Sequence, residues 1–278
     1  MKLSISPAQV ELVIKPGIKV TQAFDIQNLS DSPQIVTTSI LPWLPKGSNG
    51  SVTYDSVTTP PGIYFELNNS DLRLGQPFRL GPGQSQQLVL KISSDTNFAP
   101  TDAYYTLFIS QEPSAVADGN STSVSARIGS HLLLSFSPSQ NLPQKTTTIF
   151  TISPQIKDIF LTPLNFSGQI TNSTSHFTKI QDQIIITKNN LEISRLTLAP
   201  DNILANNSRP FRCLDSQKLP VNCFLKPPFW PGLYTATLGQ TSVNFYILPL
   251  SPLILITFLL IIRLLTTFRP TTNIKSPK

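Results

Sequence analysis

The sequence predicts an all-β protein, with two β-sandwich domains followed by a single C-terminal transmembrane helix. Three observations support this prediction. Only 13% of the 278 residues are charged, and polar uncharged residues take the place of the Lys and Glu that long surface helices favour. Short runs of alternating apolar and polar residues recur between the 25 prolines. One long uncharged stretch lies near the C-terminus.

The first domain is predicted to cover residues 1–138. Turn-forming groups such as Lys15-Pro16-Gly17 separate its alternating runs. Turn signals at intervals of roughly 10–20 residues, with alternation between them, are typical of a β-sandwich. Strands are expected at residues 10–14, 20–27, 35–40, 87–92, 104–111 and 124–136, and residues 46–83 are expected to be rich in loops.

The second domain is predicted to cover residues 146–244, after a linker-like composition near residues 138–145. No helical pattern of useful length occurs in it. Strands are expected at residues 147–153, 166–171, 183–187, 193–198, 211–213 and 234–238.

A transmembrane helix is predicted at residues 245–265, because residues 245–262 carry no charge. Eighteen residues reach roughly 27 Å at about 1.5 Å each, close to the thickness of the hydrocarbon core. A buried core helix is the alternative, but it would need polar residues on one face. Four basic residues and no acidic ones follow the segment, namely Arg263, Arg269, Lys275 and Lys278. These membrane-flanking charges predict that the tail, residues 266–278, lies in the cytoplasm and that the two domains lie outside the cell. The lipid bilayer is then a predicted partner.

The beginning of the chain conflicts with this topology. The stretch MKLSISPAQVELVIKPG contains no apolar run of the kind that a secretory signal requires. We expect the start codon to have been placed too far downstream. Prior removal of the signal, or a tail-anchored cytoplasmic protein, are the alternatives.

Cys213 and Cys223 are predicted to form a disulfide. The residues Lys218, Leu219 and Pro220 between them resemble a turn, which would place the two thiols across a hairpin. In an oxidising compartment such a bridge stabilises a small domain. Two unrelated small apolar residues are the alternative. Two cysteines are too few for a metal site, and no cofactor is expected.

Catalysis is not expected. The two histidines, His131 and His176, are interpreted as a strand residue and a loop residue, and the carboxylates show no pairing. Nucleic-acid binding is also not expected. The formal charge is +6, but four of the basic residues follow the apolar segment and no basic stripe with interleaved aromatics appears.

Two tryptophans and seven glycosylation sequons complete the candidate sites. Trp43 and Trp230 are candidate surface contacts, because aromatic faces stack on sugars, although tryptophans among prolines equally cap the ends of a sandwich core. The Asn-x-Ser/Thr sequons begin at Asn28, Asn49, Asn68, Asn120, Asn165, Asn172 and Asn206.

The opening ISPAQVELVIKPGIKVTQAFDIQNLSDSP resembles the first strands of bacterial surface proteins related to periplasmic pilus chaperones. Ser6-Pro7, Lys15-Pro16-Gly17 and residues 28–33 carry this resemblance. The layout is also similar to that of the WxL-interacting proteins of Gram-positive bacteria. These resemblances imply immunoglobulin-like domains and a non-catalytic, membrane-anchored binding or structural protein of a bacterial cell surface.

The partner that these resemblances imply is a cell-wall polymer or another surface protein. The alternative is a module like the periplasmic chaperones, which captures strands of secreted partners at a sheet edge. An extracytoplasmic hydrolase is the third hypothesis.

Overall fold

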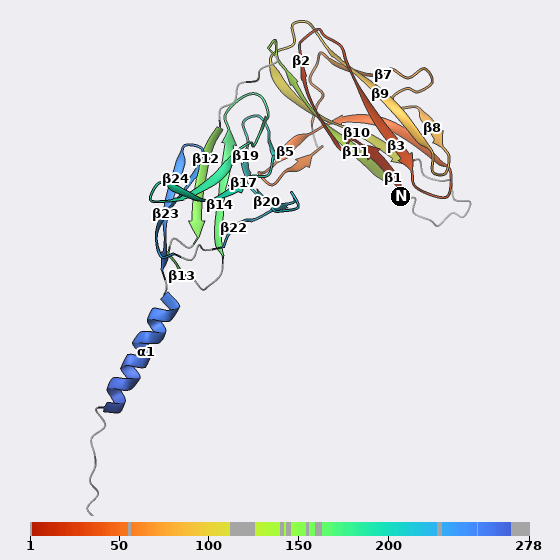
Figure 1. Ribbon diagram of the computed structural model, residues 1–278. Helices are drawn as coiled ribbons and strands as arrows, with labels where there is room; N and C mark the ends of the chain where they lie inside the picture. Colours follow the sequence, from red (N-terminus) through yellow and green to blue (C-terminus); the bar gives the residue numbers. More distant parts are fainter. Residues whose placement is uncertain are drawn as a thin grey trace, which may run out of the picture. The chain divides into compact units, whose positions relative to one another are not determined.

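The computed structural model contains two compact units built almost entirely of β-strands (Figure 1). It describes residues 2–54, 57–111, 126–139, 142, 146–153, 156–158, 163–226, 230–248 and 250–267. The first unit comprises residues 1–147 together with two later segments, 171–179 and 202–209. The second unit comprises residues 148–170, 180–201 and 210–278.

The first unit has two sheets. One has the strand order β1 (Leu3–Ser6), β3 (Val20–Asn28), β9 (Ser85–Ser94) and β7 (Ile63–Leu67). The other has the order β2 (Gln9–Ile14), β11 (Arg127–Phe136), β10 (Thr101–Gln111), β4 (Gln34–Pro42) and β8 (Pro77–Leu80). This division of the strands between two sheets is that of an immunoglobulin-like sandwich. The chain passes from one sheet to the other at the cis peptide bond between Ser6 and Pro7.

Alternation of apolar residues explains the core of this unit. In β9, Leu88, Leu90 and Ile92 are fully buried and alternate with more exposed residues. Strand β10 behaves differently, because residues 103–109 are buried without interruption. One face of β10 points to the space between the sheets. Its other face is covered by the hairpin β5 (Leu44–Lys46) and β6 (Ser51–Thr53) and by the two later segments.

The two later segments of the first unit carry short paired strands. Strand β15 (Thr178–Lys179) pairs with β18 (Asn202–Ile203) in an antiparallel arrangement. Phe177 and Leu204 from these segments pack with Trp43, Tyr104 and Leu133 in a small second core. Both segments fall within the range predicted for the second domain, residues 146–244, but their contacts group them with the first unit.

The second unit repeats the topology of the first. Its larger sheet has the order β13 (Ile156–Asp158), β24 (Thr241–Leu248), β23 (Gly232–Leu238), β16 (Gln183–Lys188) and β17 (Leu191–Thr197). As in the first unit, an early strand lies parallel to the last strand of the sandwich. The other sheet joins β12 (Thr146–Ser153), β14 (Leu164–Asn172), β19 (Ser208–Pro210) and β22 (Cys223–Leu225). A short hairpin of β20 (Cys213–Leu214) and β21 (Pro220–Val221) completes the strands. The prediction of an all-β fold with immunoglobulin-like sandwiches is therefore confirmed.

One helix, α1 (Leu250–Thr267), follows β24, the last strand of the second unit. The predicted transmembrane segment started at Phe245, but residues 245–248 belong to β24, where Phe245 and Ile247 are fully buried in the sandwich. The helix therefore starts five residues later than predicted and includes polar residues such as Ser251 and Arg263.

The prediction of a transmembrane helix at residues 245–265 is wrong. Among the residues that the structure describes, no helix combines the length and the apolar character that crossing a bilayer requires. The single-pass membrane location and the lipid bilayer as a partner depended on that helix, and both are corrected with it. The membrane-flanking role of Arg263 loses its basis as well. Arg269, Lys275 and Lys278 lie outside the described residues.

Candidate functional site

The outer face of the larger sheet in the first unit gathers most of its polar chemistry. Along β10, Asp102, Tyr104, Thr106 and Phe108 share this face because side chains alternate along a strand. The register of the β10–β11 pair places Ser135, Leu133, His131 and Gly129 opposite them, in that order. Three features lie on or beside this face: a buried polar cluster, a small cavity and a partly open strand edge.

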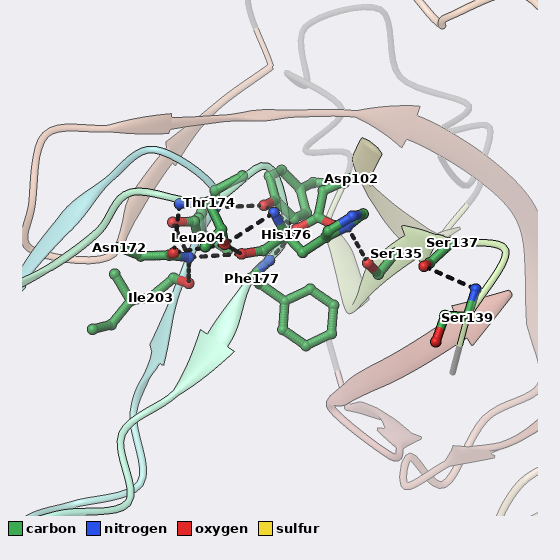
Figure 2. Close-up of polar contacts among 12 residues, drawn as sticks. Asp102, Ser135, Ser137, Ser139, Asn172, Thr174, His176, Phe177, Ile203 and Leu204 are labelled. Carbon is green, nitrogen blue, oxygen red and sulfur yellow. Dashed lines mark hydrogen bonds and ion pairs between the residues drawn. The ribbon is translucent and has the colours of Figure 1, made fainter. Parts of the chain in front are cut away.

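Asp102 is the centre of the buried polar cluster (Figure 2). Its carboxylate accepts hydrogen bonds from the Tyr104 hydroxyl at 2.7 Å and from the Phe177 backbone N–H at 2.5 Å. It also contacts Nδ1 of His176 at 3.1 Å. The Tyr104 hydroxyl in turn accepts the backbone N–H of Ala205 at 3.0 Å. Burial, together with the neighbouring carboxylate, raises the pKa of Tyr104 far above its usual value of 10. The cluster thus ties residues 171–179 and 202–209 to β10.

His176 and Ser135 lie together, but their geometry differs from that of a catalytic triad. The Ser135 hydroxyl lies 2.7 Å from Nδ1 of His176, the same nitrogen that contacts Asp102 (Figure 2). In a triad the serine and the carboxylate contact opposite ring nitrogens. Ser135 is fully buried, and His176 is only 4% exposed. This arrangement fixes the segment in place and offers no accessible nucleophile.

Two asparagines at strand ends make the same buried turn. Asn172, the last residue of β14, donates its amide to the carbonyl oxygens of His176, Ile203 and Leu204 and accepts the N–H and hydroxyl of Thr174 (Figure 2). Asn28, the last residue of β3, makes the same pattern of bonds. Its partners are Ser32, Leu80, Gly81 and Ser30.

Both of these asparagines begin an Asn-x-Ser/Thr sequon, and both are fully buried. The third residue of the sequon supplies the hydroxyl that each side-chain oxygen accepts, from Ser30 at 2.6 Å and from Thr174 at 2.8 Å. At Asn28 and Asn172 the sequon is therefore a structural turn motif and leaves no amide free for a glycan.

A cavity of about 140 Å³ lies beside the polar cluster. Trp43, His131 and Leu133 form part of its wall, and Asn202 and Arg209 form another part. The Nδ1 atom of His131 contacts the Thr106 hydroxyl at 2.9 Å, and burial lowers the pKa of His131.

Glu11 of β2 lies near this cavity and connects its strand to the two later segments. Its carboxylate accepts hydrogen bonds from Nδ2 of Asn202 at 2.6 Å and from Nζ of Lys179 at 3.1 Å. Partial burial acts to raise the pKa of Glu11, but the bonds from Asn202 and Lys179 lower it overall.

The third feature is the edge of β11. Strand β2 pairs in parallel with residues 131–136 of β11 and ends its register at His131. Among the residues that the structure describes, no strand pairs with residues 127–130 on that side. The neighbouring β1 approaches β11, but it belongs to the other sheet and pairs with β3.

The bonding pattern shows which groups face this open edge. The Gln111 N–H donates a hydrogen bond to the Ala126 carbonyl. Every second residue of β11 after Ala126 then bonds to β10. Residues 128 and 130 therefore bond to β10, whereas the main-chain groups of Arg127 and Gly129 point away from it. The N–H of His131, which points the same way, donates to the Ala8 carbonyl at 3.0 Å.

The structure brings one predicted pair of site residues together. Cys213 and Cys223 form a disulfide, as predicted. Trp43 is 4% exposed, stacks on Tyr104 and donates its indole N–H to the Tyr105 carbonyl, so its prediction as a surface contact is corrected. Trp230 is 74% exposed. Among the described residues, no group of three or more His, Cys, Asp or Glu could hold a metal ion.

Sequence reasoning missed Asp102 and Arg127. Asp102 is a lone carboxylate at the start of an apolar strand, and that position was the only signal of a buried role. Arg127 starts β11 two residues before Gly129, and a glycine inside a strand was the only signal there.

The chain is similar in structure to pilus chaperones. The class 5 fimbriae chaperone CfaA is 12% identical, with a TM-score of 0.42, over 89% of this chain and 99% of that one. The E. coli chaperone DraB is 14% identical, with a TM-score of 0.39, over 88% and 96%. The Salmonella enterica SafA pilin–SafB chaperone complex gives 12% identity, a TM-score of 0.40, and coverage of 80% and 96%.

No protein-family model matches the sequence, and no curated protein matches it. The resemblance to WxL-interacting proteins therefore finds no support. Identities of 10–14% and TM-scores of 0.33–0.42 establish neither a family nor a function for this chain.

Proposed function

We propose that this chain is a non-catalytic binding protein whose first unit captures an extended segment of a partner protein as an added strand. The observation that carries the proposal is the half-covered edge of β11. β11 has a neighbouring strand on each side, but on one side that strand, β2, pairs with only residues 131–136 of it. An incoming strand beside residues 127–130 would lie in line with β2 and complete the sheet.

Strand addition uses groups that the fold already presents. The main-chain N–H and C=O groups of Arg127 and Gly129 point to the open side, and a partner strand would bond to them as a sheet neighbour does. Gly129 has no side chain of its own. A Cβ on Gly129 would lie 2.5 Å from Cγ2 of Thr106 and 3.0 Å from Cδ1 of Phe108, so the glycine makes room for two cross-strand side chains of β10.

The end strands of the larger sheet, β2 and β8, are less suited to this role. Proteins protect such edges with proline and with charged side chains. Strand β8 begins with Pro77, and β2 carries Glu11, which is held by Lys179 and Asn202. The edge at residues 127–130 carries no proline, and its one charged side chain, Arg127, is held over the rings of Phe108 and Tyr54.

The kind of partner follows from the same features. An edge of four or five residues fits one short extended segment and no larger surface. The Cys213–Cys223 disulfide is typical of oxidising compartments, so the expected partner is a protein of such a compartment. The buried positions of Ser135 and His176 support a non-catalytic role.

Binding of a capped neutral pentapeptide, Thr-Val-Gln-Val-Thr, to the full chain tests the proposal. Addition beside β11 should shift the amide resonances of Gly129 and its neighbours in ¹⁵N spectra. The substitution Arg127→Pro removes an outward N–H without removing a bond to β10, and it should abolish the shifts. Arg127→Ala removes the side chain but keeps that N–H, so it should still bind the peptide. Shifts that persist in Arg127→Pro, or that lie away from β11, would refute strand addition at this edge.

A further inference from the structure

We infer that the β11 edge selects partner segments that carry an acidic side chain on the outer face of the added strand. This inference rests on the proposed function, because it names the partner chemistry of the same edge. The residue that carries it is Arg127, the first residue of β11.

Two aromatic rings hold the Arg127 guanidinium in place. Its Cζ lies 4.3 Å from the centroid of the Phe108 ring and 5.7 Å from that of Tyr54. The Tyr54 hydroxyl is itself fixed by a 2.8 Å hydrogen bond with Thr106. Stacking on rings leaves the in-plane N–H groups of a guanidinium directed outward, and those groups match a carboxylate in two places.

The charge of Arg127 has no carboxylate to neutralise it within the part of the chain that the structure describes. Other arginines of the chain do have such partners: Arg195 bonds to Glu192, and Arg212 bonds to Asp201. Arg127 is exposed at the end of the strand, beside the open edge. A carboxylate on the outer face of an added strand would therefore give this guanidinium, which lies over Phe108 of β10, an acidic partner across β11.

The alternating side chains of β11 determine which residues of the added strand face outward and which face the core. Arg127 and Gly129 face outward, whereas Ile128 packs against the main core. On an added strand, the residue beside Ile128 points toward that core, and the residue beside Arg127 points outward. The preferred segment therefore has an acidic residue directly next to an apolar one.

Three capped pentapeptides, Thr-Val-X-Val-Thr, test the inference, with X as Glu, Gln or Lys. The valines share one face and X lies on the other. We expect the Glu peptide to bind the full chain about threefold to tenfold more tightly than the Gln peptide, and the Lys peptide to bind more weakly than both. The advantage of Glu should shrink as salt is raised.

The variant Arg127→Gln should bind the Glu and Gln peptides equally, with the affinity that the original chain shows for the Gln peptide. Arg127→Lys, which keeps the charge, should still prefer Glu over Lys, and Trp43 fluorescence would verify that both variants fold. Equal binding of all three peptides to the original chain would overturn the acidic preference and leave strand addition standing. Absence of binding by every peptide would overturn both.

Discussion

Asn28 offers a direct test of whether the buried turn motif holds the first unit together. Its side chain is fully buried at the end of β3. Its amide nitrogen lies 2.8 Å from the Ser32 carbonyl and 3.2 and 3.0 Å from those of Leu80 and Gly81. Its oxygen accepts the N–H and the hydroxyl of Ser30. The substitution Asn28→Ala removes all of these bonds at once.

The expected loss follows from counting these bonds. An amide nitrogen has two hydrogens, so two full bonds are donated and two are accepted. A net contribution of about 1 kcal/mol each gives a loss of about 3–4 kcal/mol in the free energy of unfolding. Part of this loss arises because the Leu80 carbonyl remains buried without its partner. A loss of this size is a large share of the stability of a typical domain, about 5–15 kcal/mol.

Urea unfolding followed by tryptophan fluorescence measures this loss. The chain has two tryptophans, and Trp43 lies in the first unit, so the variant Trp230→Phe gives a background that reports on that unit alone. The exposed Asn68 provides the control, and Asn68→Ala should cost less than about 0.5 kcal/mol. A loss below about 1 kcal/mol in Asn28→Ala, or an equal loss in the control, would refute the reasoning.

Three further outcomes are expected. Replacing Cys213 and Cys223 by serine should lower the free energy of unfolding of the second unit by about 2–3 kcal/mol in chemical denaturation, because the bridge closes a short loop; an unchanged midpoint would contradict this. Burial lowers the pKa of His131, so the unfolded chain binds more protons and stability should fall as pH drops from 7 through its ordinary value of 6.5. His131→Gln should flatten that dependence in urea titrations at several pH values, and an unchanged slope would count against it. Asp102→Asn weakens the contacts to His176 and Phe177, so backbone amides of residues 171–179 should exchange faster with deuterium, whereas slow exchange would show that other contacts hold the segment.

The sequence predicts those strands whose side chains alternate between a buried face and a polar face. It does not predict strands that lack this alternation. In β9 the alternation is regular, and the expected strand at residues 87–92 lies inside the observed one, Ser85–Ser94. Strands β7 and β8 are short and lie among glycines and prolines in residues 46–83, so the region was expected to be loops. The low strand propensity of glycine and proline favours loops in this region. The few apolar residues that these strands bury, such as Ile63 and Leu80, do not offset it.

The error at the C-terminus has a related cause. Phe245 and Ile247 are buried strand residues, but they precede an apolar helix in the sequence. By composition, the end of the strand and the helix therefore form one apolar segment. The proline at position 249 marks the boundary, and the strand ends at Leu248.

The candidate site was beyond sequence reasoning for a different reason. The Asp102 carboxylate contacts the His176 ring 74 positions away and the Phe177 backbone N–H 75 positions away, and the β11 edge depends on where β2 stops. Neither relation leaves a local pattern, whereas the disulfide, whose cysteines are ten positions apart in the sequence, does. The Asn-x-Ser/Thr pattern was visible at Asn28 and Asn172, but only burial distinguishes a turn from a glycosylation site.

The second unit contains an internal comparison for the proposed edge. Strand β13 pairs in parallel with residues 246–248 of β24, and among the described residues no strand pairs with residues 241–245 on that side. Ser242 and Asn244 are the outward residues there, and Asn244 contacts the Thr235 hydroxyl at 2.8 Å. The outward residues of this second edge, Ser242 and Asn244, carry no charge and no aromatic ring.

A neutral peptide can therefore pair with either edge, whereas the preference for glutamate belongs to β11 alone. In spectra of the full chain, Arg127→Pro should remove the shifts at Gly129 and leave any shifts at β24 unchanged. If the glutamate preference followed the β24 resonances instead, a general property of open strand edges would explain it and Arg127 would not. The contrast between two edges of one chain thus separates the geometry of strand addition from the chemistry of partner choice.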